Sequence, residues 1–529
     1  MGTRGTRARL ALGMTVCATL VATMLATTAP GGAAAADDRP AERGIGSLLV
    51  TPGSLFIAGQ QLTFEGDLGV SGVRTIHLEQ HMGRIGDTWG VVEGFKAKTK
   101  PDGSFKFTYP APSMFDITMR VAAKGASTSD WTFDAKSQDL TLSTPKLPGL
   151  DPNEVLMGVP FSILVDTTPT LVGRPDLPPP PLPGRVLTLQ RRLDDNSWQT
   201  VATSVTGLLG NGAFLPTVAD PGYVTYRVRQ EDWNLTGDKV GWYPSFPFTV
   251  RVVDPLNPNR GRLTPDSAPS RPVDRDGEAP TTRGGQTAAK INKWGVSLWD
   301  FAWTYGESLT SKPARGTDRN GWWLDYSDGA GRVSKLNGQL AIDSGRNFKG
   351  AGDFGTTRAT LRENPATYGR WETAFRIKRF EAGAGDYHAV LELVPEKASD
   401  YRCGTRNITV ADVDAGGKTL DIGVRTPQGL QWTATRPIDI GTRSAALALE
   451  LGKRHITWFV DGKVVGALRV RAAIPKVPMT LRLSLVGDGD EEMNHTQLLS
   501  DWERGWSLDR GKQITKGAPL KKSSYDATC

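Results

Sequence analysis

Residues 44–145 alternate between apolar and polar side chains in short runs. "RTIHLEQHM" (74–82), "GSFKFTY" (103–109) and "FDITMRVAA" (115–123) change character at every second position. Because successive side chains of a β-strand point to opposite faces of a sheet, this period of two predicts strands with one buried face. Turn residues separate the runs, as in "PDG" at 101–103, where proline sets φ and glycine accepts a positive φ. A β module is therefore expected here.

The same pattern returns in residues 153–253. "RVLTLQRRL" (185–193), "NGAFLPT" (211–217) and "YVTYRVRQ" (223–230) follow one another in the same order as the runs of the first module. Two repeats of about 100 residues each predict two immunoglobulin-like (Ig-like) β-sandwiches. The runs resemble the bacterial Ig-like modules of exported proteins, and this resemblance implies spacers or weak binders.

Two segments interrupt this pattern. The run "PDLPPPPLPG" (175–184) cannot lie in a central strand, so a surface loop in polyproline II conformation is expected inside the second module. Residues 254–290 consist mainly of Pro, Gly, Ser, Thr and Asp, with almost nothing to bury. A disordered linker is predicted there.

The N-terminus has the pattern of a secretory signal peptide. Arg4, Arg7 and Arg9 precede an apolar run, and small residues follow it up to "GGAAAADD". This order predicts a signal peptide over residues 1–36 and a secreted, extracellular protein, with an N-terminal membrane anchor as the alternative that the long run of small residues disfavours. No later run has the roughly 18 apolar residues that a membrane-spanning helix needs, so no membrane span is expected after signal removal.

The charge balance gives little support to a nucleic-acid partner. Without the three signal-peptide arginines, 60 basic side chains face 56 acidic ones, and no basic stripe interrupts the chain. Nucleic-acid binding is therefore not expected.

The C-terminal part, residues 291–529, has the longest alternating runs. Among them are "GRWETAFRIKRF" (369–380), "YHAVLELVP" (387–395), "HITWFVDGKVVGALRV" (455–470) and "MTLRLSLVG" (479–487). Long strands over more than 200 residues predict a jelly-roll β-sandwich, so the whole chain is expected to be all-β.

Five stretches of this part resemble family-16 glycoside hydrolases in kind and order. They are "NGQLAI" (337–342), "YGRWETAFRIK" (368–378), "ITWFVDGKVV" (456–465), "MTLRLSL" (479–485) and "SDWERGWSL" (500–508). The resemblance implies a concanavalin A-like jelly roll and an exported protein that acts on a polysaccharide such as a β-glucan or a galactan.

The family carries three carboxylates on one strand, as Glu-x-Asp-x-Glu or, with a bulge, Glu-x-Asp-x-x-Glu. The matching strand here is "NITVADVD", after Cys403 and Gly404. The resemblance puts Asn407 at the nucleophile position and Thr409 at the middle one. Asp412 takes the acid/base position only in the bulged register. The usual pair of acids, about 5–5.5 Å apart for retaining hydrolysis, is thus missing.

A second source of acids lies in "YHAVLELVPE". His388 and Glu392 are four residues apart and therefore share one strand face. If that face lines the cleft, Glu392 and Asp412 form a non-standard acid pair. The alternative is that His388 and Glu392 make only an exposed cross-strand polar contact.

The same region holds candidates for sugar binding. Asn and Arg offer several directed hydrogen bonds to neighbouring hydroxyls. The candidate substrate-binding residues are Tyr387, His388, Arg402, Arg406, Asn407, Thr409 and Trp323. Further rings that could stack on sugars are Trp322, Trp371 and Trp432, with core packing as the alternative for each.

Two cysteines remain after signal removal, Cys403 and Cys529. In an exported chain they are expected to pair in a disulfide that ties the C-terminal tail to the jelly roll. No cofactor is expected and no metal-ligand spacing is present. The family often carries a structural calcium, for which "GDGDEE" (487–492) is a candidate loop, a solvated acidic turn being the favoured interpretation.

Three functions are consistent with these patterns. The favoured one is a secreted carbohydrate-binding protein that recognises a polysaccharide or cell-wall glycan as a monomer. The second is an active glycosidase, retaining or inverting, with the displaced pair Glu392 and Asp412. The third is a structural or adhesive surface protein.

Overall fold

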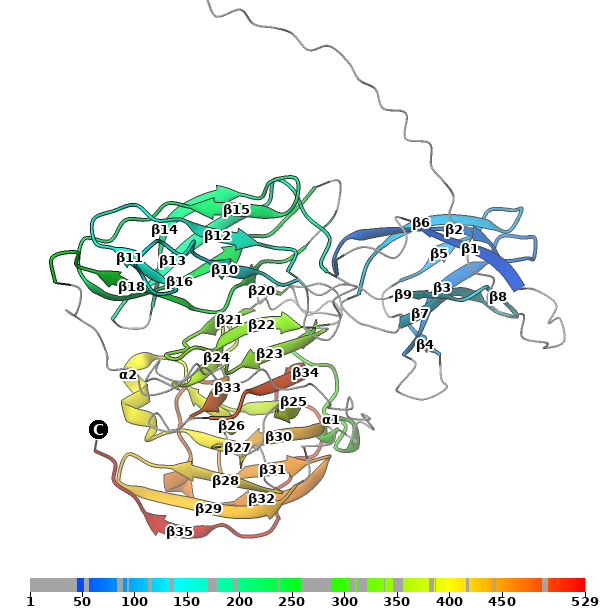
Figure 1. Ribbon diagram of the computed structural model, residues 1–529. Helices are drawn as coiled ribbons and strands as arrows, with labels where there is room; N and C mark the ends of the chain where they lie inside the picture. Colours follow the sequence, from blue (N-terminus) through cyan, green and yellow to red (C-terminus); the bar gives the residue numbers. More distant parts are fainter. Residues whose placement is uncertain are drawn as a thin grey trace, which may run out of the picture. The chain divides into compact units, whose positions relative to one another are not determined.

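The structure is a computed structural model of the chain, and strands make up most of what it describes (Figure 1). The described residues are 45–51, 57–82, 89–92, 95–112, 117–133, 138–169, 178–194, 197–235, 238, 240–257, 287–303, 310–311, 321–336, 338–345, 355–379, 385, 387–414, 418–438, 440, 444–487 and 493–528. The prediction of an all-β protein with sandwich sheets is confirmed. The predicted signal peptide and most of the predicted linker lie outside these residues.

The first β module contains β1–β9. Their spatial order is β4-β3-β7-β8-β1-β2-β6, with β5 on β3 and β9 on β7. The bounds are β1 Ile45–Thr51, β2 Gln61–Asp67, β3 Thr75–Met82, β4 Gly90–Val91, β5 Ala97–Lys98, β6 Ser104–Pro110, β7 Ile117–Ala123, β8 Ala126–Thr128 and β9 Trp131–Phe133. Alternate residues such as Leu78, Met119 and Val121 fill its core, as the period of two predicts.

The second β module contains β10–β18 in two sheets, β10-β12-β15 and β11-β18-β16-β13-β14, with β17 on β16. The bounds are β10 Thr141–Ser143, β11 Glu154–Leu156, β12 Ile163–Asp166, β13 Val186–Arg192, β14 Trp198–Val205, β15 Asn211–Phe214, β16 Gly222–Gln230, β17 Tyr243–Pro244 and β18 Phe248–Val253. The predicted boundary at residue 145 needs a correction. Leu140 is buried in the second core and β10 pairs with β12, so this module begins before residue 145.

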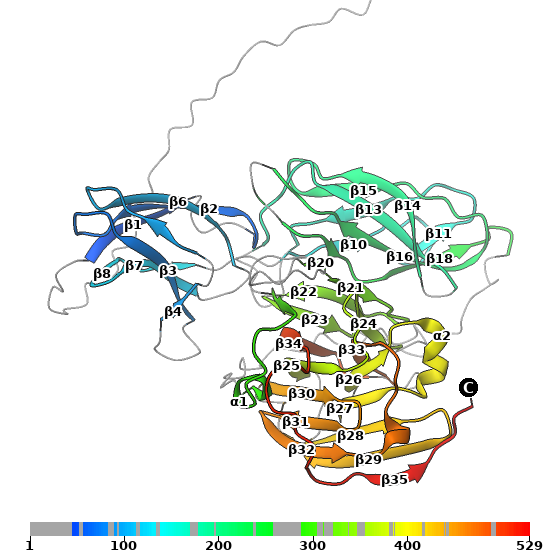
Figure 2. The same ribbon diagram turned by 180° about the vertical axis from the view of Figure 1, so that it is seen from behind.

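The C-terminal sandwich spans residues 287–528 and consists of two sheets, which Figures 1 and 2 show as facing layers. Sheet A has the order β22-β23-β34-β25-β30-β31-β32, with β19 on β34. Sheet B has the order β20-β21-β24-β33-β26-β27-β28-β29-β35. One large apolar cluster fills the space between the sheets, including Trp303, Trp323, Phe375 and Trp458.

The bounds of the elements in this sandwich complete the fold. They are α1 Ala288–Ile291, β19 Trp299–Ala302, β20 Thr310–Ser311, β21 Gly321–Asp325, β22 Arg332–Leu336, β23 Gln339–Asp343, β24 Thr357–Arg362, β25 Gly369–Arg379, β26 His388–Pro395, α2 Ala398–Tyr401, β27 Ile408–Asp414, β28 Thr419–Arg425, β29 Leu430–Pro437, β30 Ala445–Leu451, β31 Ile456–Val460, β32 Lys463–Leu468, β33 Met479–Val486, β34 Thr496–Trp506 and β35 Lys521–Ser524, with 3₁₀ turns at Arg402–Gly404 and Arg471–Ala473.

Helix α1 corrects the predicted start of this domain at residue 291. Thr287 caps the helix by accepting a hydrogen bond from the Lys290 backbone N–H at 3.2 Å. Ala288 is fully buried against Trp294, Phe459 and Trp506. The last residues assigned to the linker therefore belong to the sandwich, because they cover an apolar patch on sheet A.

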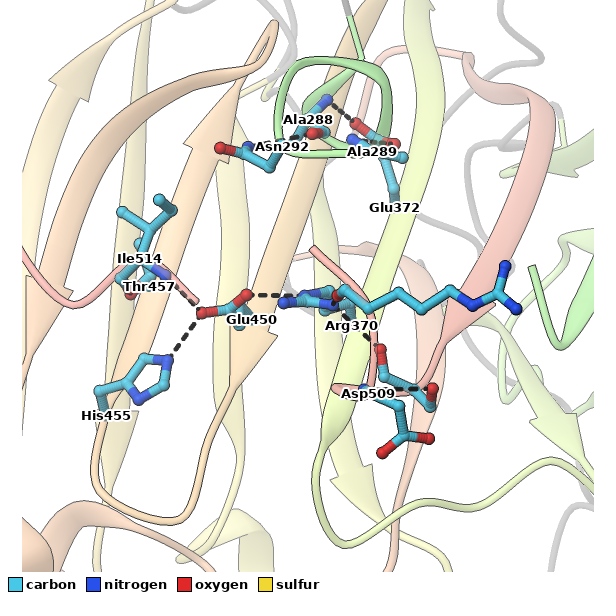
Figure 3. A network of polar contacts seen from close by, with 12 residues as sticks. Ala288, Ala289, Asn292, Arg370, Glu372, Glu450, His455, Thr457, Asp509 and Ile514 are labelled. Carbon is cyan, nitrogen blue, oxygen red and sulfur yellow. Dashed lines mark hydrogen bonds and ion pairs between the residues drawn. The ribbon is translucent and has the colours of Figure 1, made fainter. Parts of the chain in front are cut away.

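Buried charges lie beneath the same cover on sheet A (Figure 3). Arg370 Nε donates to Glu450 Oε2 at 2.6 Å, and both side chains are fully buried. Glu450 Oε1 also contacts His455 Nε2 at 2.7 Å and accepts from the Ile514 backbone N–H at 2.8 Å. Glu372 accepts hydrogen bonds from the backbone N–H groups of α1. These charges tie the helix and the C-terminal segment to the sheet.

Among the helices within the described residues, none is long and apolar enough to cross a membrane.

Candidate functional site

The candidate site lies on the outer face of sheet B, the face that points away from the core. In β26, Ala389, Leu391 and Leu393 are buried in the core. The alternation of strand side chains therefore places His388 and Glu392 on the outer face. Their predicted common face is present in the structure.

Strand β27 contains the bulge that the longer family motif would need. Thr409 pairs with Glu392, and Asp412 pairs with Val390, with a register shift between them. Val410 and Ala411, two consecutive residues, are both buried. The extra residue returns the strand to its original orientation, so Thr409 and Asp412 share the outer face. Of the two registers considered, the bulged one is the one observed.

Two hydrogen bonds join β26 and β27 on this face. Asn407 Nδ2 donates to Glu392 Oε1 at 3.0 Å. His388 Nδ1 lies 2.9 Å from Asp412 Oδ1. Asn407 is only 6% exposed and its Oδ1 has no hydrogen-bond partner among the described residues. The buried side chain of Asn407 is thus engaged by Glu392. The side chains of His388 and Asp412, in contrast, are exposed to solvent.

Burial raises the pKa of Glu392 above its ordinary value. The hydrogen bond from Asn407 and the charges of Arg482 and Arg425 act against this rise, and the nearby Asp412 adds to it. A carboxyl group with a raised pKa keeps its proton to a higher pH and can donate it to a leaving oxygen. The raised pKa of Glu392 is the direction of shift that a general acid needs.

The structure adds two neighbours that the sequence analysis missed. Arg482 of β33 is directly opposite Glu392, and Asp421 of β28 is directly opposite Asp412. Side chains directly opposite in an antiparallel pair have Cβ atoms roughly 4.5–5.5 Å apart. Arg482 carried a sequence signal, because it is a lone charge in the apolar run "MTLRLSLV". Asp421 alternates with buried residues in "TLDIGVR" in the same way.

The predicted stacking rings are not on this face. Tyr387 and Trp323 are 1% and 2% exposed and belong to the core between the sheets, so neither offers a face to a sugar. The alternation that puts His388 outward necessarily turns Tyr387 inward. Trp371 and Trp432 are core residues as well. The side chain of Trp322 lies outside the described part.

The two predicted arginine ligands lie in the turn before β27. Arg406 Nη1 is 3.3 Å from Asp400 Oδ1, so an ion pair within the turn already engages it. Arg402 is exposed and has a left-handed φ of 35°. Neither residue belongs to the row of outward side chains on β26 and β27.

The remaining predictions about this region fall partly outside the described residues. Cys403 is exposed at the same turn, but Cys529 is not described, so their pairing stays a prediction. Residues 488–492 of the candidate calcium loop are not described either. Within the described ranges, no group of three or more His, Cys, Asp or Glu side chains is arranged to hold a metal ion.

No protein-family profile and no curated protein matches the chain. Solved structures are similar to part of it. The catalytic domain of an endo-1,3-beta-glucanase (laminarinase) from Thermotoga petrophila is 15% identical with a TM-score of 0.28, covering 34% of this chain and 81% of that one. A laminarinase from a Flavobacterium species is 16% identical with a TM-score of 0.26, covering 33% and 81%. A glycosyl hydrolase family protein from Mycobacterium fortuitum is 12% identical with a TM-score of 0.28, covering 40% and 100%. With identities and TM-scores this low, the function has to be argued from the residues of this chain.

Proposed function

We propose that the outer face of sheet B binds a polysaccharide. The observation that carries this proposal is the polar row across β33, β26, β27 and β28. It consists of Arg482, Glu392, Thr409, His388, Asp412 and Asp421. Neighbouring strands are about 4.8 Å apart, so four strands present donors and acceptors over a length comparable to a few sugar rings. Such a row matches the spaced hydroxyls of a glycan chain.

Binding can be tested without assuming catalysis. Equilibrium binding of the full chain to laminarin and to a soluble galactan would be measured by isothermal titration calorimetry. Asp412→Asn and Glu392→Gln are expected to weaken binding of at least one of them by about 10-fold or more, the loss of roughly one hydrogen bond to a charged group. The exposed Asp509→Asn, on the segment after β34 of sheet A, is the matched control. Unchanged affinity in both site variants would contradict the proposal.

Hydrolysis by Glu392 and Asp412 is the second candidate function. Its supporting observation is the contrast between a half-buried Glu392 with a raised pKa and a more exposed Asp412 on the same face. Asp412 pairs with Val390, two residues from Glu392, so the two acids are diagonal neighbours. The backbones of diagonal neighbours are about 7–8 Å apart. Such a backbone spacing is compatible with the separation of about 6.5–9.5 Å between carboxyl groups that leaves room for a water molecule in inverting hydrolysis.

The two functions differ in the release of reducing ends. An inverting enzyme would release them from laminarin or galactan, and both Glu392→Gln and Asp412→Asn would abolish release while retaining measurable binding. Proton NMR of the first product would show the inverted anomer. The exposed Asp509→Asn is the control, since it removes a carboxylate on the segment after β34, outside both the acid pair and the polar row. If the wild type releases no reducing ends from either glycan, the hydrolytic candidate fails and the binding proposal is unaffected.

We further propose, from the N-terminal sequence alone, that the chain is exported and acts outside the cell. N-terminal sequencing of the exported protein is expected to begin near Asp37. A mature protein that still contains the apolar run of residues 10–25 would contradict this.

A further inference from the structure

A groove of about 890 Å³ runs beside the proposed site. On the C-terminal sandwich it is lined by Tyr326, Arg358, Arg362, Tyr401 and Arg482, together with Glu396. On the second β module it is lined by Trp198, Arg227, Arg229 and Trp242. Arginine is the most frequent residue type in this lining, so the groove is well suited to negatively charged groups.

The groove is continuous with the proposed polysaccharide site through one residue pair. Arg482 lines the groove and lies directly opposite Glu392 in the pairing of β33 with β26. On the other side, Arg482 pairs with Thr360 of β24, and Arg358 and Arg362 lie two residues to either side of Thr360 on the same face. A glycan on β26 and β27 therefore reaches the arginines within one or two strand spacings, about 5–10 Å.

Arg482 is available for an anion. Its Nε donates to Thr360 Oγ1 at 3.1 Å and its Nη1 to the Tyr401 hydroxyl at 3.4 Å, both neutral oxygens. Within the described residues it makes no ion pair with a carboxylate. A guanidinium has five N–H donors, so most of those of Arg482 are not used by these two contacts.

Two further arginines are only partly neutralised. Arg362 Nη1 lies 3.4 Å from Glu396 Oε1, and Arg358 Nη2 lies 3.4 Å from Asp328 Oδ2. Both are single contacts rather than the two parallel bonds of a bidentate pair, which is the stronger geometry. Both guanidinium side chains retain more than a quarter of their exposure.

The groove residues of the second β module are held against the C-terminal sandwich by specific contacts. Arg227 Nη1 forms an ion pair with Asp325 Oδ2 at 2.8 Å, and both side chains are largely buried. Arg192 Nη2 donates to the Gly329 carbonyl oxygen at 2.8 Å. Arg227 also lies over the Trp198 ring, 4.3 Å from its centre. Asp325 is occupied by Arg227, so it does not neutralise the groove arginines on the sandwich.

We propose that this groove selects polysaccharides that carry anionic groups, sulfate esters or uronate carboxylates, and that Arg482 binds the anion. The inference rests on the proposed polysaccharide binding and adds the chemical class of the ligand. Planar guanidinium groups recognise both anions by paired N–H donors. The second module is then part of the recognition surface in addition to any role as a spacer.

The test uses one glycan backbone in three forms. Laminarin, sulfated laminarin and laminarin oxidised to carboxylate at its primary hydroxyls would be titrated against the full chain at about 0.15 M salt, where exposed charges more than about 8 Å apart are screened. The wild type is expected to bind at least one charged form about 10-fold more tightly than neutral laminarin. The form that binds more tightly identifies the anion as sulfate or carboxylate.

The variants decide whether Arg482 is responsible. Arg482→Gln is expected to reduce the ratio of charged to neutral affinity by about 5-fold or more, and Arg362→Gln by a smaller factor. Arg471→Gln removes one exposed arginine outside the groove and should leave the ratio unchanged; thermal unfolding would confirm that each variant is folded. Equal wild-type affinity for all three forms, or an equal effect of Arg471→Gln, would overturn the anion proposal. Absence of binding to all three forms would overturn the underlying polysaccharide proposal.

Discussion

Asn407 donates a hydrogen bond to Glu392 from the neighbouring strand, with Nδ2 and Oε1 3.0 Å apart. By the family resemblance, Asn407 occupies the position of the catalytic nucleophile, yet the side chain is almost completely buried. An amide there cannot attack an anomeric carbon. It can hold the carboxyl group of Glu392 in one orientation on the outer face. At this point of the face the carboxyl group is therefore supplied by β26, and β27 supplies the amide that holds it.

Removal of this amide should change the titration of Glu392. The hydrogen bond lowers the pKa of Glu392 against the effect of burial. Asn407→Ala is therefore expected to raise that pKa further, and it should also weaken polysaccharide binding because Glu392 loses its fixed orientation. The pKa can be measured by carbon-detected NMR of the glutamate carboxyl groups. Thr433→Ala on the same face is the control. A Glu392 pKa that is unchanged or lower in Asn407→Ala would contradict this account.

The alternation of side chains predicted most of the site from the sequence. It predicted that His388 and Glu392 lie on the same face of one strand. It also predicted that the side chains of Asn407 and Thr409, two residues apart, point to the same side of the next strand. The sequence was compatible with two registers for β27, one with a bulge and one without. What decides it in the structure is the burial of both Val410 and Ala411, two small apolar residues that can enter the core together.

The covering of sheet A could not be predicted from the same periodicity. Arg370, Glu372 and Glu450 alternate with apolar residues, which in a strand indicates a solvent-exposed face. In the structure, α1 and the segment around Ile514 cover them. Neither segment has a repeating pattern that says where it packs. Tyr387 and Trp323 were assigned to sugar stacking but are core residues. Tyr387 precedes the outward-facing His388 and therefore points inward. Trp323 lies directly opposite Leu361 of β24, which is also a core residue, so both side chains point into the core.

The buried pair Arg370 and Glu450 should be sensitive to the loss of one partner. Arg370→Met leaves the carboxylate of Glu450 buried with His455 and the Ile514 N–H as its remaining partners among the described residues. Loss of one member of a buried pair typically costs about 3–5 kcal/mol. Replacing both members, Arg370→Met with Glu450→Leu, should cost less than Arg370→Met alone. Calorimetry of the full chain can compare these variants with the exposed control Arg471→Met. A double variant less stable than both single ones would argue against this.

The predicted disulfide between Cys403 and Cys529 should be present in exported protein. Cys403 is exposed in the turn before β27, and β35 pairs with β29 shortly before the C-terminus. The closed loop would exceed 100 residues, for which the chain-entropy model gives about 5 kcal/mol. Peptide mapping without reduction should yield one linked peptide containing both cysteines. Two thiols titrated in the denatured, unreduced protein would rule the bond out.

The stability of the C-terminal sandwich should fall as the pH rises from about 5 to about 8, because of Glu503. Burial raises the pKa of this fully buried carboxyl group to about 8, although hydrogen bonds from Ser500 and Trp303 lower it in part. The Trp303 Nε1 lies 2.8 Å from Glu503 Oε2. Glu372, whose pKa burial raises to about 7, acts in the same direction. Between the unfolded pKa near 4.5 and the folded value, the folded state holds a proton that the unfolded state has released, so raising the pH favours unfolding. A shift of this size corresponds to on the order of 3–5 kcal/mol for Glu503.

Glu503→Gln keeps an uncharged side chain of similar shape at every pH. It should match the wild type near pH 5 and be clearly more stable near pH 8.5, whereas the exposed Glu363→Gln should follow the wild type throughout. Calorimetric unfolding of the full chain across this pH range measures the difference, and parallel curves for Glu503→Gln and wild type would show that Glu503 ionises without cost in the folded state.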